Sequence, residues 1–401
     1  MLTNQQIEIV KSTVPVLQLH GETITKAFYR NLFEENPGLK DIFNMANQAN
    51  GDQQRSLAAS VVAYAANIDQ LQNLGPAVSL IAHKHCSLDV LPEHYPIVGR
   101  NLMRAICEVL GDAVTPEVTD AWGAAYNQLA DILIGIEGKM YSENVARGWA
   151  GFKPFTVSQK RKESETITSF ELTPEDGKPL PVHQPGQFLS IQVKGVGENT
   201  EIRQYTISSR TNGRTYRISV KREPSGVVSN YLHDIVEEGD SLSIHMPHGD
   251  FVLREDEFGP VALISGGVGI TPVLAMLERL VEVRTERPVV FAHAAIDGSV
   301  HAFRDYVREL VADHPNIEVC FIYAEPSSDD APGVHYDLAG LVSKSILGNL
   351  VPPNADCYCC GPKGFMRVVD TALDELGVPA SHRRQEVFGP TLELAQPTST
   401  T

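Results

Sequence analysis

The hydrophobic pattern of the chain changes twice, and these changes limit the folds that it can adopt. Up to about residue 145, apolar residues recur with the period of an α-helix. From residue 153 the pattern shifts to short β-rich runs, which turn-forming segments such as PEDGKP and TNGR separate. Near Pro260 a third pattern begins, in which buried strands alternate with helical segments. A chain of 401 residues is also too long for a single hydrophobic core.

We therefore predict a multidomain protein with an all-α domain at 1–145, an antiparallel β-barrel at 151–257 and a doubly wound α/β domain at 258–396. The predicted barrel strands are FTVSQKR, ETITSFELT, QFLSIQV, RQYTISS, TYRISVKR and SLSIHMP. The predicted strands of the parallel sheet are VALISGG, PVVFAHAAI, IEVCFIY and ADCYCCGP.

Composition excludes several classes of protein. The formal net charge is −17, which makes the chain a poor binder of nucleic acid and of anionic membranes. We see neither an apolar signal core after Met1 nor an apolar run long enough to span a membrane.

The six cysteines are scattered. Cys357, Cys359 and Cys360 are crowded, but no second pair offers zinc spacing, so a strand with small apolar thiols is favoured. We expect a reduced, cytoplasmic protein.

Residues 83–99, HKHCSLDVLPEHYPIVG, begin with His83 and His85, which face in different directions. Val78, Ile81, Ala82 and His85 share one helical face, so an imidazole lies among aliphatic side chains. His83 precedes His85 by two residues and points about 200° away around the helix. A buried imidazole suits the proximal side of a haem iron. The alternative is a core histidine bonded to a backbone carbonyl.

Other polar residues of the helical region also fall on apolar stripes. Gln53 heads the stripe that continues through Leu57 in the helix predicted at about 52–68, and it needs a partner there. A bound diatomic ligand would be such a partner, and Tyr29 could present its hydroxyl to the same pocket. Phe43 follows a Pro-Gly corner and could wedge a flat cofactor. Each residue taken alone can also be plain core.

Glu137 shares a stripe with Leu129, Leu133, Ile136 and Met140, and a carboxylate on such a face is rarely left unpaired. Tyr95 offers a hydroxyl near the histidine helix. A chain of carboxylate, tyrosine and histidine would make the imidazole a stronger electron donor to iron.

Residues 1–145 thus resemble the globin domain of the flavohaemoglobins. The resemblance implies that His85 is the metal ligand of haem b and that Tyr95 and Glu137 are its proximal hydrogen-bonding pair. It also places five residues around the haem: Tyr29, Gln53 and Leu57 in the distal pocket, Phe43 against the haem and Lys84 towards a flavin.

The segment RQYTIS at 203–208 has the alternation of a strand, with Arg203 and Tyr205 on one face and Gln204 and Thr206 on the other. In SGVVSNYLHD, a glycine leads into a helix start whose free N–H groups can hold a pyrophosphate. Together with PGQF at 185–188, these segments resemble the flavin barrel of the ferredoxin-reductase family. The resemblance implies FAD, with Arg203 on phosphate, Tyr205 on the isoalloxazine and the Thr206 hydroxyl at the reactive nitrogen. The residues that it assigns to FAD are Phe188, Arg203, Gln204, Tyr205, Thr206, Gly226, Val227, Val228 and Ser229.

The turn SGGVGITP at 265–272 follows a buried strand and opens a helix, so its glycines let the backbone approach a phosphate closely. It is not the usual dinucleotide fingerprint, because Pro272 stands where the last glycine would be. With CCGP at 359–362 and EVFGP at 386–390, it resembles the NAD(P)H-binding half of the same reductases. The residues assigned to this site are Gly267, Val268, Gly269, Ile270, Thr271, Pro272, Glu386, Phe388, Gly389 and Pro390.

The resemblance covers nearly all of residues 1–391 and implies a nitric oxide dioxygenase. Such an enzyme converts NO and O₂ to nitrate with electrons from NAD(P)H, passed through FAD to the haem. Tyr29 and Gln53 would steady the oxygen. The competing class is a sensor whose reductase resets the iron, and a peroxide or ferric reductase is a second enzymatic alternative. The lack of an arginine beside Asp297 favours NADH but leaves NADPH open. We expect a monomer with NO and O₂ as substrates, no nucleic-acid partner and no membrane segment.

Overall fold

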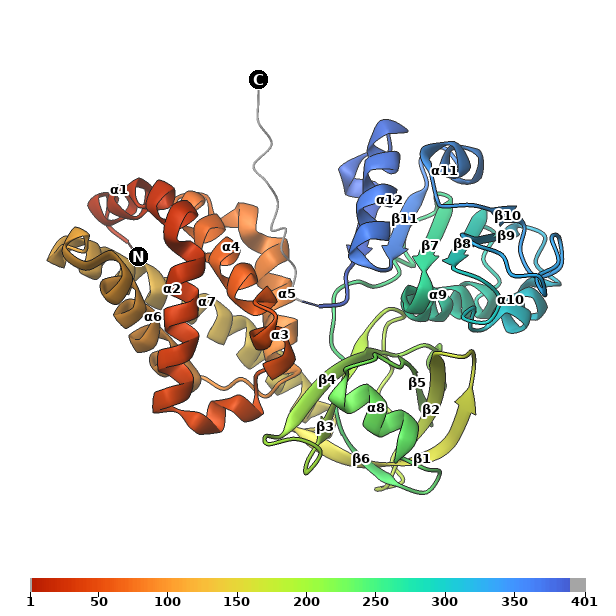
Figure 1. Ribbon diagram of the computed structural model, residues 1–401, viewed down its shortest axis with the longest axis horizontal. Helices are drawn as coiled ribbons and strands as arrows, with labels where there is room; N and C mark the ends of the chain where they lie inside the picture. Colours follow the sequence, from red (N-terminus) through yellow and green to blue (C-terminus); the bar gives the residue numbers. More distant parts are fainter. Residues whose placement is uncertain (1, 390–401) are drawn as a thin grey trace. The chain divides into compact units, whose positions relative to one another are not determined.

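The computed structural model describes residues 2–389, and its internal contacts divide the chain into two compact units (Figure 1). One unit contains the N-terminal helices together with residues 197–203, and the other contains the rest of two β-sheets with their helices. The boundaries predicted for three domains remain a prediction, because the contacts divide the chain into two units and not three. Pro390, which we expected to bind the nicotinamide cofactor, lies outside the described residues.

The first unit is built from helices (Figure 1). They are α1 (Asn4–Ser12), α2 (Val14–Glu35), the 3₁₀ turn η1 (Pro37–Asp41), α3 (Met45–Ala49), α4 (Asp52–Ala66), η2 (Leu71–Leu74), α5 (Gly75–Cys86), α6 (His94–Leu110), η3 (Gly111–Ala113) and α7 (Pro116–Ala146). Local sequence sets several of the ends. Thr3 and Gln6 form a capping box at α1, and Thr115 accepts from the Val118 N–H ahead of Pro116 at the start of α7. This confirms the predicted all-α domain.

The core of this unit forms where α2 packs on α4 and α6, and a second cluster forms where α5 meets α7. The second cluster joins Ala82 of α5, Tyr95 of α6 and Leu133 of α7. The apolar stripe expected around His85 is therefore the face that α5 turns towards α6 and α7.

The barrel is a six-stranded sheet in the order β4-β3-β6-β1-β2-β5. Its elements are β1 (Phe152–Lys162), β2 (Ile167–Pro174), β3 (Phe188–Val193), β4 (Glu201–Thr206), β5 (Tyr216–Lys221), α8 (Val227–Asp234) and β6 (Ser241–His245). An antiparallel bridge joins Ile207, the residue after β4, to Ile218 within β5, so the two edge strands meet and the sheet closes on itself. The six predicted barrel strands are all present.

The second sheet is parallel, in the order β10-β9-β8-β7-β11-β12. Its elements are β7 (Val261–Gly266), η4 (Gly267–Gly269), α9 (Ile270–Glu282), β8 (Val289–Ala295), α10 (Arg304–Val311), β9 (Ile317–Tyr323), β10 (Leu338–Ala339), α11 (Lys344–Leu350), β11 (Asp356–Cys360), α12 (Lys363–Glu375), η5 (Ala380–His382) and β12 (Arg383–Glu386). The chain leaves β7 towards β8 on one side and returns as β11 on the other. The point between β7 and β11 is therefore the topological switch point, where α/β sheets bind ligands.

Side chains alternate between the two faces of this sheet. Leu263 and Cys360 pack with α9 and α10, whereas Ile264, Cys357 and Cys359 pack with α11 and α12. All three cysteines are buried, and burial raises the pKa of the Cys357 thiol to about 12. Within residues 2–389, no group of three or more His, Cys, Asp or Glu residues is placed to hold a metal ion. The crowded thiols thus fill the strand, as predicted.

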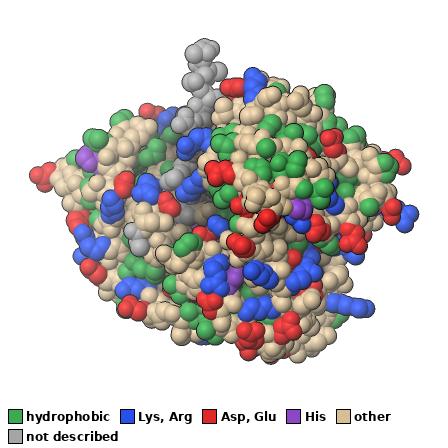
Figure 2. All heavy atoms as spheres, turned by 45° about the vertical axis from the view of Figure 1, so that its right-hand side comes forward, with side chains coloured by type: hydrophobic (Ala, Val, Ile, Leu, Met, Phe, Trp, Pro, Cys, Tyr) green, Lys and Arg blue, Asp and Glu red, His purple; other side chains and the backbone are tan. Residues whose placement is uncertain are grey.

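Acidic and basic side chains are interspersed on the face that Figure 2 shows. In the described part of the chain, no helix is both long and apolar enough to cross a bilayer.

Candidate active site

His85, Tyr95 and Glu137 meet between α5, α6 and α7. The His85 Nδ1 lies 2.8 Å from Glu137 Oε1 and 3.1 Å from the Tyr95 hydroxyl, which itself donates to Glu137 Oε1 at 2.7 Å. Glu137 is only 2% exposed, whereas the His85 side chain is 32% exposed. An Nδ1–H that donates to the carboxylate leaves Nε2 with its lone pair, which is the form that binds a metal.

Glu137 also sets the electrostatics of this triad. Burial, followed by the hydrogen bond to the carboxylate, raises the pKa of Tyr95 far above its usual value. The phenol therefore stays protonated and remains a donor. Tyr126 supports the arrangement, since its hydroxyl donates to the Tyr95 carbonyl at 2.7 Å. Its ring lies so close to Gly99 that a Cβ there would come within 2.5 Å of it. No sequence pattern indicated Gly99 or Tyr126.

The distal candidates gather around Tyr29 on α2. The Tyr29 ring lies 5.8 Å from both Phe33 and Phe43, between ring centroids. Burial raises the pKa of Tyr29 to about 12, and hydrogen bonding from the side chains of Gln53 and Gln48 acts in the opposite direction. Sequence reasoning named Tyr29, Phe43 and Gln53 but missed Gln48, because the short helix α3 carries no periodic signal.

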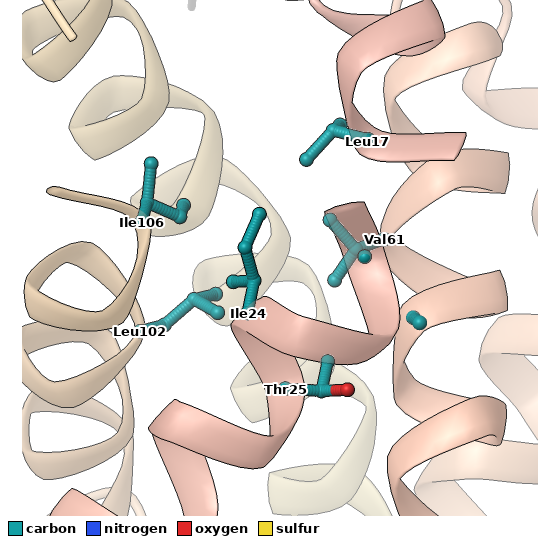
Figure 3. Close-up of a pocket in the computed structure, with 8 residues that line it drawn as sticks. Leu17, Ile24, Thr25, Val61, Leu102 and Ile106 are labelled. Carbon is teal, nitrogen blue, oxygen red and sulfur yellow. The ribbon is translucent and has the colours of Figure 1, made fainter. Parts of the chain in front are cut away.

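A small apolar cavity lies one helical turn from this cluster along α2 and α4 (Figure 3). Its volume is about 10 Å³, and its lining residues are Leu17, Gly21, Ile24, Thr25, Ala58, Val61, Leu102 and Ile106. The Thr25 hydroxyl is already bonded to backbone carbonyls, including that of Gln54 at 2.9 Å. The cavity offers no polar partner for water. It is too small for a cofactor and is not the predicted haem site.

The residues on both sides of the predicted haem site fit a haem. His85 presents a half-exposed imidazole whose other nitrogen is held by a buried carboxylate. Leu57 and Val61 on α4 and Ile81 on α5 are apolar and only partly buried. An axial histidine, an apolar lining and distal hydrogen-bonding groups are what a haem pocket requires. Lys84 follows His83 in the last turn of α5, and its expected position towards the flavin remains a prediction.

The predicted flavin residues lie on β4 and at the start of α8. Arg203 forms an ion pair with Glu201 at 2.8 Å, so a phosphate would share this guanidinium with a carboxylate. Gln204 is exposed and Thr206 is buried, although both lie on the same face of the strand. Their roles towards a flavin remain predictions.

Gly226 caps α8, and a Cβ at this position would lie 2.3 Å from Ser229 Oγ. The N–H groups of the first helical turn, which begins at Val227 and Val228, point out of the helix towards any anion. On β3, the Phe188 ring packs against Gly249, where a Cβ would come within 3.0 Å of it. Gly249 also has a φ of +114°, so its own backbone favours glycine as well.

We expect Arg203→Ala to copurify with less flavin while retaining its haem, because Arg203 lies on the barrel strand β4, whereas the proposed haem ligand His85 lies on α5 and pairs with Glu137. Flavin and haem absorption per protein measure this directly. Arg203→Lys keeps the charge but loses the planar fork, so it should retain an intermediate amount of flavin. Arg214→Ala changes an exposed barrel arginine and is the matched control. Parental flavin content in Arg203→Ala, with an unchanged melting temperature, would show that Arg203 does not hold the flavin.

The glycine turn Gly267–Gly269 lies at the switch point of the parallel sheet. Gly267 has a φ of +54°, and a Cβ on Gly269 would come within 2.2 Å of the Cys360 carbonyl oxygen. Both glycines are thus required by the backbone. Ile270 and Thr271 are buried, so a dinucleotide would meet their N–H groups rather than their side chains.

The remaining nicotinamide candidates follow the last strand. Glu386 ends β12, Phe388 is 42% exposed and Gly389 has a φ of +122°. Val268 precedes them in the chain as part of the glycine turn, and its carbonyl accepts from the Thr271 hydroxyl at 3.0 Å. The assignment of these residues to a nicotinamide cofactor remains a prediction.

Comparisons with known proteins agree with this arrangement of sites. Family models match at residues 26–133 for a globin, 154–253 for an oxidoreductase FAD-binding domain and 263–371 for an oxidoreductase NAD-binding domain. A flavohemoprotein of Deinococcus radiodurans is 53% identical over 399 residues, which cover 98% of this chain and 99% of the relative. A flavohemoprotein of Bacillus subtilis is 48% identical over 400 residues, covering 99% of this chain and 100% of the relative.

Two solved structures extend the comparison. The flavohemoglobin of Malassezia yamatoensis, with bound FAD and heme, has a TM-score of 0.86 at 28% identity and covers 97% of this chain and 100% of its own. The FAD/NAD-binding domain of a nitric oxide dioxygenase from Vibrio cholerae has a TM-score of 0.54 at 39% identity. It covers 59% of this chain and 99% of its own.

Proposed function

Because this chain belongs to the flavohemoprotein family, we propose that it is an NAD(P)H-dependent nitric oxide dioxygenase. The observation that carries the proposal is the similarity over the whole chain, which joins a globin to a complete reductase. The net reaction consumes two NO, two O₂ and one NAD(P)H, and it yields two nitrate ions, NAD(P)⁺ and a proton. The enzyme removes NO, and the reductase supplies the electrons that each catalytic cycle consumes.

The cofactors are haem b, FAD and NAD(P)H. When bound, the haem iron and FAD supply the redox chemistry, and FAD divides a two-electron hydride into single electrons. His85 holds the iron, and the glycine turn at the switch point holds the dinucleotide. The barrel strand β4 and the first turn of α8 hold the flavin. We propose the division into a globin domain at 1–145, a FAD domain at 151–257 and an NAD(P)H domain at 258–396.

The side chains on the proximal and distal sides of the haem have different roles. On the proximal side, Glu137 accepts a hydrogen bond from the His85 Nδ1–H and makes the imidazole more basic at Nε2. A more basic imidazole donates more electron density to the iron. On the distal side, Tyr29, Gln53 and Gln48 supply hydrogen-bond donors for dioxygen, and Phe43 and Leu57 keep water out.

We also propose that the protein is a cytoplasmic monomer whose small-molecule substrates are NO and O₂. A net charge of −17 supports solubility as a monomer and disfavours nucleic-acid binding. Light scattering of the purified holoprotein would give the molar mass, and a dimeric mass would contradict this part of the proposal.

Turnover tests the function directly. In aerobic buffer with NADH, added NO should increase NADH consumption and produce nitrate in proportion. A sensor that uses its reductase only to reset the iron would consume NADH no faster with continued NO. Nitrate formation below one per NO consumed would contradict the dioxygenase. Repeating the measurement with NADPH determines which nicotinamide is preferred.

The proximal carboxylate provides a second test. Glu137→Gln keeps the shape of the side chain but removes its negative charge, so the imidazole becomes a weaker donor. We expect the iron–histidine stretching band of the ferrous protein to shift to lower frequency. NO turnover should fall while the haem content stays intact. Glu143→Gln changes an exposed glutamate on the same helix and is the control. A parental stretch with parental turnover would show that Glu137 is only structural.

A further inference from the structure

Glu278, a residue of α9, connects the barrel to the α/β domain. It is only 5% exposed. Its Oε1 accepts from Arg217 Nη2 at 2.7 Å and from the Tyr306 hydroxyl at 2.9 Å, and its Oε2 accepts from the Arg210 backbone N–H at 2.8 Å. Arg217 and Arg210 belong to the barrel, and Tyr306 lies on α10. One carboxylate thus joins two folded parts of the same compact unit.

Arg217 is held from both sides. Its Nε donates to Ser208 Oγ at 3.2 Å, and its Nη2 donates to the Ser208 carbonyl in the barrel. On the other side, the guanidinium lies 5.2 Å from the centre of the Phe303 ring, next to the start of α10. A buried guanidinium needs this many partners, because the charge has lost most of its water. We call Arg217, Glu278 and Tyr306 the clamp.

The clamp stands close in sequence to both proposed cofactor sites. Ser208 follows Thr206, the last residue of the proposed flavin strand β4, by two positions. Ser208 is also paired with β5, since its N–H donates to the Arg217 carbonyl at 2.7 Å. Glu278 lies about two turns along α9 from the glycine turn. The clamp therefore links the strand proposed for the flavin with the helix proposed for the dinucleotide.

We propose that the clamp positions the two halves of the reductase, so that the nicotinamide and the flavin meet at the distance that hydride transfer requires. This inference rests on the proposed function. In the step, the C–H bond of the dihydronicotinamide breaks, and its hydrogen and two electrons pass to the flavin. Such a transfer needs close contact between the reacting atoms, and a misplacement of about 1 Å can cost about 100-fold in rate.

Stability alone is a poor reason for this arrangement. Replacement of a buried ion pair by apolar side chains of similar volume is often neutral or stabilising, whereas removal of one partner is costly. The clamp is instead suited to orientation, because its bonds leave Glu278 in different directions. Each bond ends on a different element, and together they fix rotation as well as distance.

The experiment uses variants of the holoenzyme that separate position from stability. Glu278→Gln weakens the clamp, and Tyr306→Phe removes one donor. The double variant Arg217→Met with Glu278→Leu removes both charges and so avoids an unpaired buried charge if Glu278→Gln fails to fold. Arg308→Met is the control, because Arg308 pairs with Asp337 inside the α/β domain. The readouts are anaerobic flavin reduction by NADH in a single turnover, flavin content, NAD⁺ affinity and amide hydrogen exchange of residues 208–210.

We expect flavin reduction to slow by about 10–100-fold in Glu278→Gln and in the double variant, and less in Tyr306→Phe. Flavin content and NAD⁺ affinity should stay near parental, and the amides at 208–210 should exchange faster. Parental reduction rates in the double variant, despite faster exchange, would overturn the proposal. So would a loss of rate that only follows lost flavin, or an equal loss in Arg308→Met. If NADH and NADPH both fail to reduce the parental flavin, the proposed function fails first, and the clamp proposal falls with it.

Discussion

His85→Ala is expected to yield a protein that retains FAD but lacks stoichiometric haem and has no NO-dependent NADH consumption. Of the triad His85, Tyr95 and Glu137, only His85 carries a nitrogen atom that can bind iron. Glu137 and Tyr95 are hydrogen-bonded to each other. Without the imidazole, no described residue of that triad can replace the ligand. The Soret absorbance per protein measures the loss, and the flavin band measures whether the reductase remains intact.

His83→Ala is the matched control, because it removes an imidazole from the same helix two residues away. A second variant protects the interpretation against misfolding. His85→Gly leaves a cavity beside Glu137, and imidazole added to the buffer should bind there and restore the haem spectrum. Haem loss in His83→Ala together with an unchanged spectrum in His85→Ala would reverse the assignment.

Tyr29→Phe is expected to accelerate dissociation of oxygen from the ferrous protein by roughly 10–100-fold. The substitution removes one hydroxyl, and a hydrogen bond to a partly charged acceptor contributes about 1.5–3 kcal/mol. About 1.4 kcal/mol corresponds to a tenfold change in the rate or equilibrium constant. Gln53 and Gln48 both lie beside the Tyr29 hydroxyl. Any hydrogen bond that they donate to the oxygen in its place would reduce the acceleration of oxygen dissociation. Rapid mixing of the oxygenated protein with a ligand trap gives the rate.

The chain offers a closely matched control for this substitution. Tyr64 is also buried on a helix of the globin, and its hydroxyl donates to the Ala125 carbonyl at 2.8 Å. Tyr64→Phe removes a hydrogen bond of the fold without touching the distal cluster. It should lower the melting temperature and leave the oxygen off-rate unchanged. Equal off-rates for the parent and Tyr29→Phe would remove Tyr29 from the distal site.

Some features of this protein are set by residues that are close together in the sequence, and others are set by contacts between distant segments. Short-range features decide the elements. The change from a helical period to short strands predicts the boundary between the helices and the barrel, and Gly267 is required by the φ of +54° of its own backbone. The inward face of His85 follows from its spacing to Ile81 and Ala82 in the same way.

Periodicity states which face of an element is buried, but it does not state which buried faces meet. Glu137 is 52 residues from His85, and only the packing of α5 on α7 brings its carboxylate to the imidazole. The sequence by itself therefore indicated a carboxylate that needed a partner, and the resemblance to a known family supplied that partner. Gly99 looks ordinary in sequence, because the Tyr126 ring that requires it comes from the distant helix α7.

The clamp residues show most clearly what hydrophobic periodicity does not predict. Arg217 takes a polar position in the alternating strand β5 and yet is only 9% exposed, and Glu278 is the one charged residue among the buried residues of α9. The burial of neither charge is explained within its own element. Their charges become tolerable only after the barrel and the α/β domain meet, because a buried charge is stabilised by partners that close in space and not by neighbours in sequence. Hydrophobic periodicity specifies which faces of the elements are apolar, whereas the packing of distant segments specifies which buried charges pair with one another.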